Sequence, residues 1–101
     1  MNWYQHVVHN GGLKIGGHYV KIKEVEPNDL AEDDVCGTTE LVNNTISISK
    51  DLPQSHKEAT MIHEVIHIIN WKLDEPTVEF LAQAIYGIIS DNYMGKGRKK
   101  C

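Results

Sequence analysis

Two histidines, His63 and His67, lie four residues apart, and Glu64 directly follows the first of them. This is the HExxH pattern, and on a helix its two imidazoles project from one face about 6 Å apart. At that spacing both rings can bind one zinc ion, whose nitrogen ligands lie at roughly 2.0–2.1 Å. Glu64 lies about 100° further around the helix, where it can take a proton from a zinc-bound water. The pattern therefore predicts a zinc site with Glu64 as general base. The alternative is a pair of core histidines, but a helix interior is a costly place for such polar groups without partners.

Catalytic zinc usually takes three protein ligands, so a further residue is needed beside the two histidines. The residues after His67 depart from the metzincin continuation of the pattern. We expect the third ligand to be Glu79, which lies twelve residues past His67 on a second helix folded back by a short link. Asp74 and Glu75 are alternatives, although we expect them to cap that helix instead. A histidine of the N-terminal half is a further alternative.

Three other side chains could contribute to the chemistry of this site. Tyr86 lies seven residues after Glu79, so it points the same way, and its phenol could donate to an oxyanion. The alternative for Tyr86 is a packed core residue with its hydroxyl at the rim. His56 lies two turns before His63, about 10.5 Å along the helix, so we expect it to line the cleft without reaching the ion. Cys36 is expected to be a small buried apolar residue.

The first half of the chain shows the period-two alternation of strands. Residues 18–25 and 45–49 alternate, and a short apolar segment at 13–15 lies between two glycine pairs. Asn43 and Asn44 form a plausible hairpin turn because asparagine tolerates positive φ. These patterns predict a small antiparallel sheet.

After residue 52 the hydrophobic period changes to 3.6, which indicates helices. Pro53 and the Ser55–Glu58 capping-box spacing predict the start of the helix that carries the two histidines. A second helix is predicted to start at residues 74–77. The expected core stripes of the two helices are Ile62, Val65, Ile66, Ile69 and Leu73, followed by Val78, Leu81, Ala82, Ile85 and Ile89. The predicted fold class is α+β, with the sheet followed by an active-site helix and a second, antiparallel helix.

Length and composition suit one domain of about 1–95 with a basic C-terminal tail at 96–101. The 101 residues are 41% hydrophobic and carry a formal net charge of −4, which disfavours a strongly basic nucleic-acid binder. We expect no membrane span and a cytoplasmic location, because no apolar run is long enough and no secretion signal begins the chain. Its two cysteines do not make a disulfide framework.

Residues from about 14 to 93 resemble the small HExxH proteins of phages and bacteria, similar to the ImmA/IrrE-type zinc metallopeptidases. The resemblance lies in the segments 44–52, 60–67 and 78–86. It implies a minimal zincin-like fold of gluzincin type, with one zinc on His63, His67 and Glu79 and with Glu64 as base. In zincins a strand along the cleft pairs with an extended peptide, and residues 45–49 would be that strand here.

These observations predict a zinc metallopeptidase that hydrolyses an intracellular protein or peptide, such as a phage or host regulator. The alternative is a catalytically silent zincin-fold binding module in which zinc is structural. A third hypothesis, nucleic-acid binding through the basic tail, finds no support in the rest of the chain.

Overall fold

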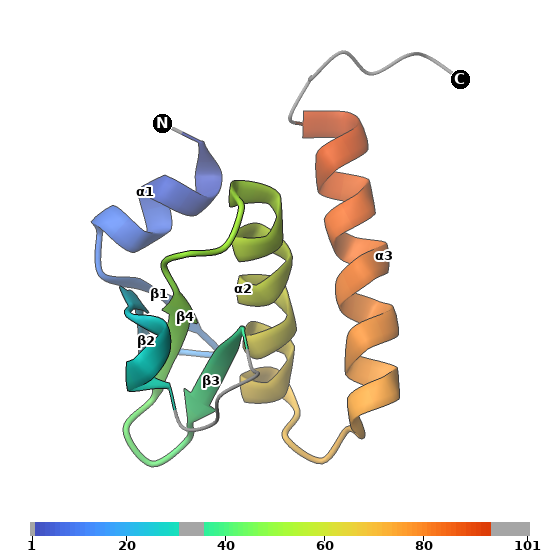
Figure 1. The fold of residues 1–101 in the computed structure, drawn as a ribbon. Coiled ribbons are helices and arrows are strands. Elements are labelled where there is room, and N and C mark those ends of the chain that lie inside the picture. The colour runs from blue at the N-terminus through green and yellow to red at the C-terminus, as the bar shows by residue number, and fades with distance from the viewer. Residues whose placement is uncertain (1, 31–35, 94–101) are drawn as a thin grey trace.

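A computed structural model describes residues 2–30 and 36–93 of the chain (Figure 1). The predicted basic tail at 96–101 lies outside these residues. The elements in chain order are α1 (Trp3–His9), β1 (Gly12–Ile15), β2 (His18–Val25), a short 3-10 helix (Pro27–Asp29), β3 (Gly37–Glu40), β4 (Thr45–Ser49), α2 (Gln54–Ile69) and α3 (Glu75–Tyr93).

The four strands of the described residues form one mixed sheet in the order β1-β2-β4-β3. β1 and β2 pair antiparallel, as do β3 and β4, but β2 and β4 run parallel, with Ile22 opposite Ile46. The predicted α+β class is confirmed, whereas the expectation of a purely antiparallel sheet is wrong. The difference arises because β4, the second strand of the β3–β4 hairpin, pairs with β2 and runs in the same direction as β2.

Local sequence signals fix most of the strand boundaries. β2 and β4 occupy the predicted segments, and the hairpin turn before β4 contains Asn44 at a φ of 49°. Gly12 is required where β1 meets β2, because a Cβ there would lie 1.9 Å from the Val20 carbonyl oxygen. Helix α1 was not predicted, although Asn2 and Gln5 form a capping box at its start.

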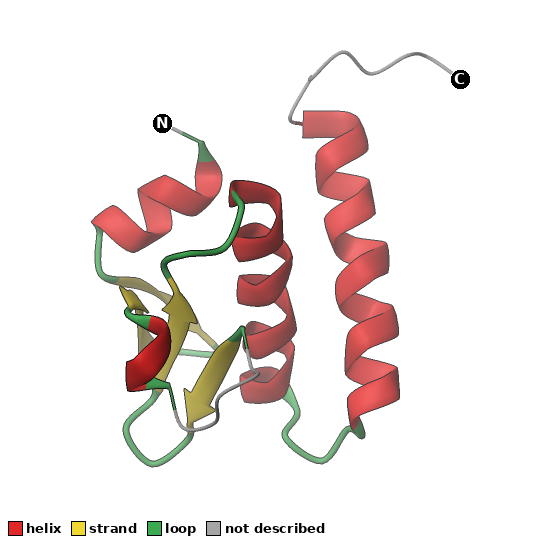
Figure 2. Ribbon diagram, in the orientation of Figure 1, coloured by secondary structure: helices red, strands yellow, loops and turns green. Residues whose placement is uncertain are grey.

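Helix α2 lies between the sheet and α3, and α1 packs on β1 and β2 (Figures 1 and 2). The described residues therefore form two cores, one on each side of α2. Between the sheet, α1 and α2 lie Tyr4, Val20, Ile22, Ile46, Ile48 and Met61. Between α2 and α3 lie Ile62, Ile66, Val78 and Ala82. No helix among residues 2–30 and 36–93 is long and apolar enough to cross a membrane.

Two details of the predicted helices are wrong. Pro53 is the N-cap of α2 and no side chain caps it, so Ser55 and Glu58 form no capping box. Glu58 instead turns inward and is fully buried. Ile69, expected in the core stripe, is 64% exposed because α2 ends at this residue, and Ile85 is also exposed.

Candidate metal centre

Helix α2 presents His63 and His67 toward α3, with each side chain 19% exposed. Their ring centroids lie 5.0 Å apart. Ile62 and Ile66, one residue before each histidine, are buried against α3, and they fix the rotation of the helix. The two imidazoles are therefore held on one face, as the spacing predicts.

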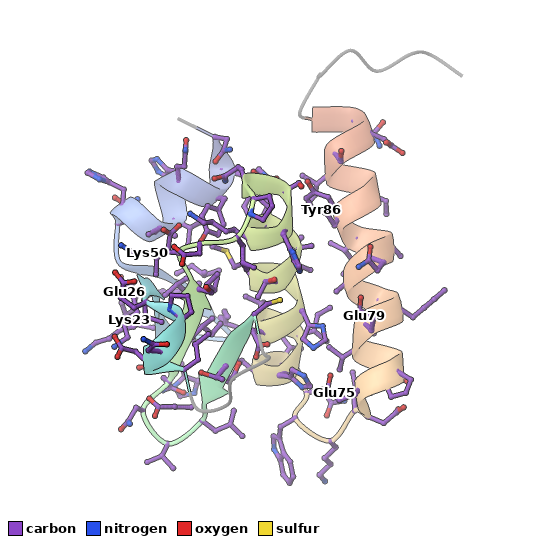
Figure 3. The ribbon with its side chains drawn as sticks, viewed as in Figure 1. Lys23, Glu26, Lys50, Glu75, Glu79 and Tyr86 are labelled. Carbon is purple, nitrogen blue, oxygen red and sulfur yellow. The ribbon has the colours of Figure 1, made fainter. Side chains whose placement is uncertain are left out.

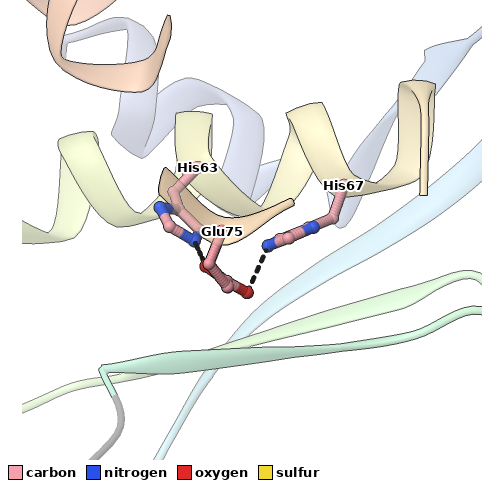
Figure 4. A group of neighbouring side chains, drawn as sticks. All are labelled: His63, His67 and Glu75. Atoms are coloured by element: carbon pink, nitrogen blue, oxygen red, sulfur yellow. Dashed lines mark hydrogen bonds and ion pairs between the residues drawn. The ribbon is translucent and has the colours of Figure 1, made fainter. Parts of the chain in front are cut away.

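The first residue of α3, Glu75, places its carboxylate between the two rings (Figure 4). Glu75 Oε1 lies 3.0 Å from His63 Nε2, and Oε2 lies 3.0 Å from His67 Nε2. One ligand atom from each of the three residues lies within 4.8 Å of the others. This group could hold a metal ion.

Glu79 lies one turn further along α3, on the same side of the helix as Glu75 (Figure 3). Its Oε1 lies 3.0 Å from Nδ1 of His63, the nitrogen that faces away from Glu75. The Gln83 amide donates to Glu79 Oε2 over 2.8 Å. That hydrogen bond, and then His63, hold the pKa of the Glu79 carboxyl below its usual range. The structure thus brings both glutamates to His63, but on different nitrogens.

The two ring nitrogens of His63 cannot both donate a hydrogen bond while the imidazole is neutral. A neutral imidazole carries a single N–H, yet both His63 nitrogens face carboxylate oxygens at 3.0 Å. One of the two contacts would be repulsive unless His63 gains a second proton or its Nε2 faces a metal ion. A cation held by Nε2 and Glu75 would remove the conflict and would leave Nδ1–H to donate to Glu79.

Glu64, the predicted base, is 8% exposed and is not part of the histidine–Glu75 group. The Thr39 hydroxyl on β3 donates to Glu64 Oε1 over 2.5 Å, which fixes the orientation of the carboxylate. Glu64, which follows His63 in the chain, is therefore held by the sheet.

The strand next to this site is β3, and this corrects the strand implied by the resemblance. β4 is hydrogen-bonded on both sides, to β2 and to β3, so Thr45–Ser49 cannot pair with a further chain. β3 is at the edge of the sheet and carries Thr39. An extended peptide would have to pair with β3.

A cavity of about 220 Å³ adjoins the cluster. His56 lines it together with His63, Glu64 and Glu79, which confirms the place predicted for His56. Cys36 also lines it, half-buried, with its sulfur 3.3 Å from His56 Nε2. The expectation that Cys36 is a buried apolar residue is therefore wrong.

Tyr86 lies further along α3 than the two glutamates (Figure 3). Its hydroxyl donates to Glu58 Oε1 over 3.1 Å. Burial, and then the Glu58 carboxylate, raise the pKa of the Tyr86 phenol. Its predicted role as an oxyanion donor stays a prediction.

No role was predicted for Thr39, and Glu75 was expected to cap α3. Asp74 does cap α3: its carbonyl accepts from the Val78 N–H, and its carboxylate accepts from the Thr77 hydroxyl over 2.6 Å. With Asp74 as the cap, Glu75 is the first helical residue, four before Glu79 and so on the same face. The four-residue spacing of Glu75 and Glu79 was the sequence feature that could have identified Glu75 as a possible ligand. For Thr39 the sequence offered none, because its contact with Glu64 depends on how the sheet packs.

Comparison of this chain with protein-family models, curated proteins and solved structures finds no match.

Proposed function

We propose that His63, His67 and Glu75 bind a divalent metal ion and that the centre hydrolyses peptide bonds. The observation that carries the proposal is the pair of carboxylates on the two nitrogens of His63, at 3.0 Å each. A divalent ion at Nε2 satisfies Glu75 and both histidines at once.

Zinc fits this donor set best. Two imidazole nitrogens and a carboxylate are ligands of known catalytic zinc sites. His63, His67 and Glu75 would hold such an ion, since one ligand atom from each of them lies within 4.8 Å of the others. Bound zinc supplies Lewis acidity and lowers the pKa of its water to about 7.

The other residues of the site have separate tasks under this proposal. Glu64 accepts a proton, and the Thr39 hydroxyl keeps its carboxylate from rotating. Glu79 fixes the orientation of the His63 ring through Nδ1. The outer edge of β3, which pairs with no other strand among the described residues, offers backbone groups to an extended peptide beside Glu64.

Metal content tests the site. Wild type, His67→Ala and Glu75→Gln are each equilibrated with zinc, freed of excess metal and assayed by elemental analysis. We expect about one zinc per chain in wild type and a large loss in both variants. Glu26→Gln is the matched control, because Glu26 is a surface carboxylate paired with Lys50. Equal zinc in wild type and Glu75→Gln would contradict Glu75 as a ligand.

Turnover tests the chemistry. Wild type and Glu64→Gln are screened against a peptide library, with cleavage read by mass spectrometry. We expect Glu64→Gln to keep its zinc and to lose cleavage by about 10²–10⁴-fold, the contribution typical of a general base. Equal cleavage by both proteins would contradict the role of Glu64.

The second candidate is a binding module in which the ion is structural. The observation that favours it is the origin of the three ligands: His63 and His67 come from α2 and Glu75 from α3. An ion there would tie the start of α3 to α2. This candidate predicts zinc binding without cleavage of any library peptide.

A further inference from the structure

Cys36 and His56 form a thiol–imidazole pair that the proposed metal chemistry does not use. The Cys36 sulfur lies 3.3 Å from His56 Nε2, within the distance expected of a sulfur hydrogen bond. The two residues come from separate segments: Cys36 directly precedes β3, and His56 lies in the first turn of α2. A thiol and a base within hydrogen-bond distance are the pattern of an activated sulfur nucleophile.

The backbone holds this pair close to Glu64. A Cβ on Gly37, the residue after Cys36, would lie 2.9 Å from Thr60 Cγ2 and 3.7 Å from Glu64 Cγ. The chain at Gly37 is therefore pressed against α2, and only a glycine fits there without displacement. Cys36 is thereby fixed at the wall of the cavity that His63 and Glu64 also line.

The cavity can accept a small molecule. Its volume of about 220 Å³ is many times the roughly 10–15 Å³ that a single water molecule needs. Any group attached to the Cys36 sulfur and turned inward occupies space beside Glu64.

We propose that Cys36 and His56 form a thiol–disulfide exchange site in the wall of the metal pocket, with a small organic disulfide as co-reactant. His56 accepts the thiol proton, and the Cys36 sulfur attacks one sulfur of the disulfide. The S–S bond of the co-reactant breaks as a new S–S bond to Cys36 forms. The released thiolate takes up a proton, so Cys36 is oxidised and one half of the co-reactant is reduced.

The adduct leaves His63, His67 and Glu75 in place but fills the space beside Glu64. The exchange reaction depends only on Cys36 and His56. Its effect on the metal centre rests on the proposed function, and the two parts are tested separately.

The first experiment measures the exchange rate of Cys36. In the full-length Cys101→Ser protein Cys36 is the remaining cysteine, and its reaction with Ellman's disulfide reagent is followed by absorbance. His56→Gln is compared with His18→Gln, a control at an exposed strand position. Each native rate is divided by the rate in urea, which removes the intrinsic reactivity of the thiol. We expect His56→Gln to slow the native reaction by roughly tenfold or more, since a positioned base contributes about 10²–10⁴-fold. Equal normalised rates in the two variants would overturn the proposal.

The second experiment tests whether the adduct shares the pocket with the metal. A trifluoroethyl-thiol mixed disulfide is formed on Cys36, and its ¹⁹F resonance is recorded before and after addition of Co²⁺. We expect Co²⁺ to broaden or shift the resonance, and His67→Ala to abolish the effect. Co²⁺ that binds without changing the resonance would overturn the shared pocket. Absence of Co²⁺ binding would contradict the metal centre and leave the exchange result of the first experiment standing.

Discussion

The interface of α2 and α3 contains two glutamates in opposite situations, at opposite ends of the helix pair. Glu58 is fully buried, and its oxygens accept hydrogen bonds from Asn2, Gln54 and Tyr86. Glu75 is 70% exposed, and its oxygens face two imidazole nitrogens. The first carboxylate is surrounded by groups that always carry hydrogens to donate. The second faces imidazole nitrogens, each of which donates only in one tautomer, and a neutral His63 that donates to Glu75 has no N–H left for Glu79.

This difference separates a structural carboxylate from a candidate ligand. The three neutral donors satisfy Glu58 within the protein, so its cluster links α1, α2 and α3 without help from a ligand. The Glu75 cluster, with Glu79 on the other nitrogen of His63, is one proton short when both imidazoles are neutral, and a cation at His63 Nε2 would remove that shortage. Burial alone would have pointed to the wrong glutamate, because the buried one has all its partners.

The largest expected effect is the response of stability to zinc. Free zinc at 1,000 times its dissociation constant should raise the free energy of unfolding by about 4.1 kcal/mol, if the unfolded chain binds none. Glu75→Gln should lose most of this gain, because its side chain no longer supplies a charged oxygen. Chemical unfolding with and without zinc measures both.

Tyr86→Phe is the matched variant for this prediction, since it changes the Glu58 cluster and leaves the Glu75 cluster intact. It should keep the full zinc response. A zinc gain of equal size in wild type and Glu75→Gln would mean that the two clusters do not differ in the way their contacts indicate.

The second effect concerns Glu79, which faces the other nitrogen of His63. Glu79→Gln should weaken zinc binding by about 10–100-fold, the usual cost of changing the hydrogen-bond partner of a metal-bound histidine. Competition with a chromophoric chelator measures the affinity. If Glu79→Gln removes zinc entirely while Glu75→Gln retains it, Glu79 is the third ligand, as the sequence analysis predicted.

How much the sequence could predict depends on whether a feature is local. The alternation of residues 18–25 and 45–49 and the four-residue spacing of His63 and His67 are local, and the structure contains these strands and this histidine pair. The parallel pairing of Ile22 with Ile46 joins distant segments, and no local pattern encodes its direction. The Thr39–Glu64 contact is non-local for the same reason.

Two errors came from local signals with more than one interpretation. Ser55 and Glu58 have capping-box spacing, but Pro53 occupies the N-cap of α2 and the Glu58 side chain instead accepts hydrogen bonds from Gln54 and Tyr86. Glu75 follows a capping residue and was assigned to the link, although a helix that begins there turns it toward His63. In each case tertiary contacts decided between the alternatives.

The third effect concerns the Glu58 cluster alone. Tyr86→Phe removes the hydroxyl that donates to Glu58 Oε1 and leaves a buried oxygen without that partner. We expect a loss of about 1–2 kcal/mol in the free energy of unfolding, equal with and without zinc. Urea titration measures it. A reduced zinc affinity in Tyr86→Phe would instead connect Tyr86 to the metal centre.

The smallest effect lies at the start of α3, beside Glu75. The Thr77 hydroxyl donates to Asp74 and holds the pKa of that carboxyl below its ordinary value. Because the folded pKa is the lower one, the stabilisation is present above the unfolded value of about 3.9 and is lost as the pH falls through the folded value. Thr77→Val should therefore be less stable than wild type above about pH 5 and should approach it in acid.

The stabilities of wild type and Thr77→Val are compared by thermal unfolding between neutral and acid pH. A chelator is present so that zinc does not contribute. Asp74→Asn is the control, since its amide cannot titrate and its stability should fall less steeply in acid than that of wild type. A Thr77→Val curve parallel to wild type over the whole range would show that the hydroxyl stabilises Asp74 equally in both protonation states.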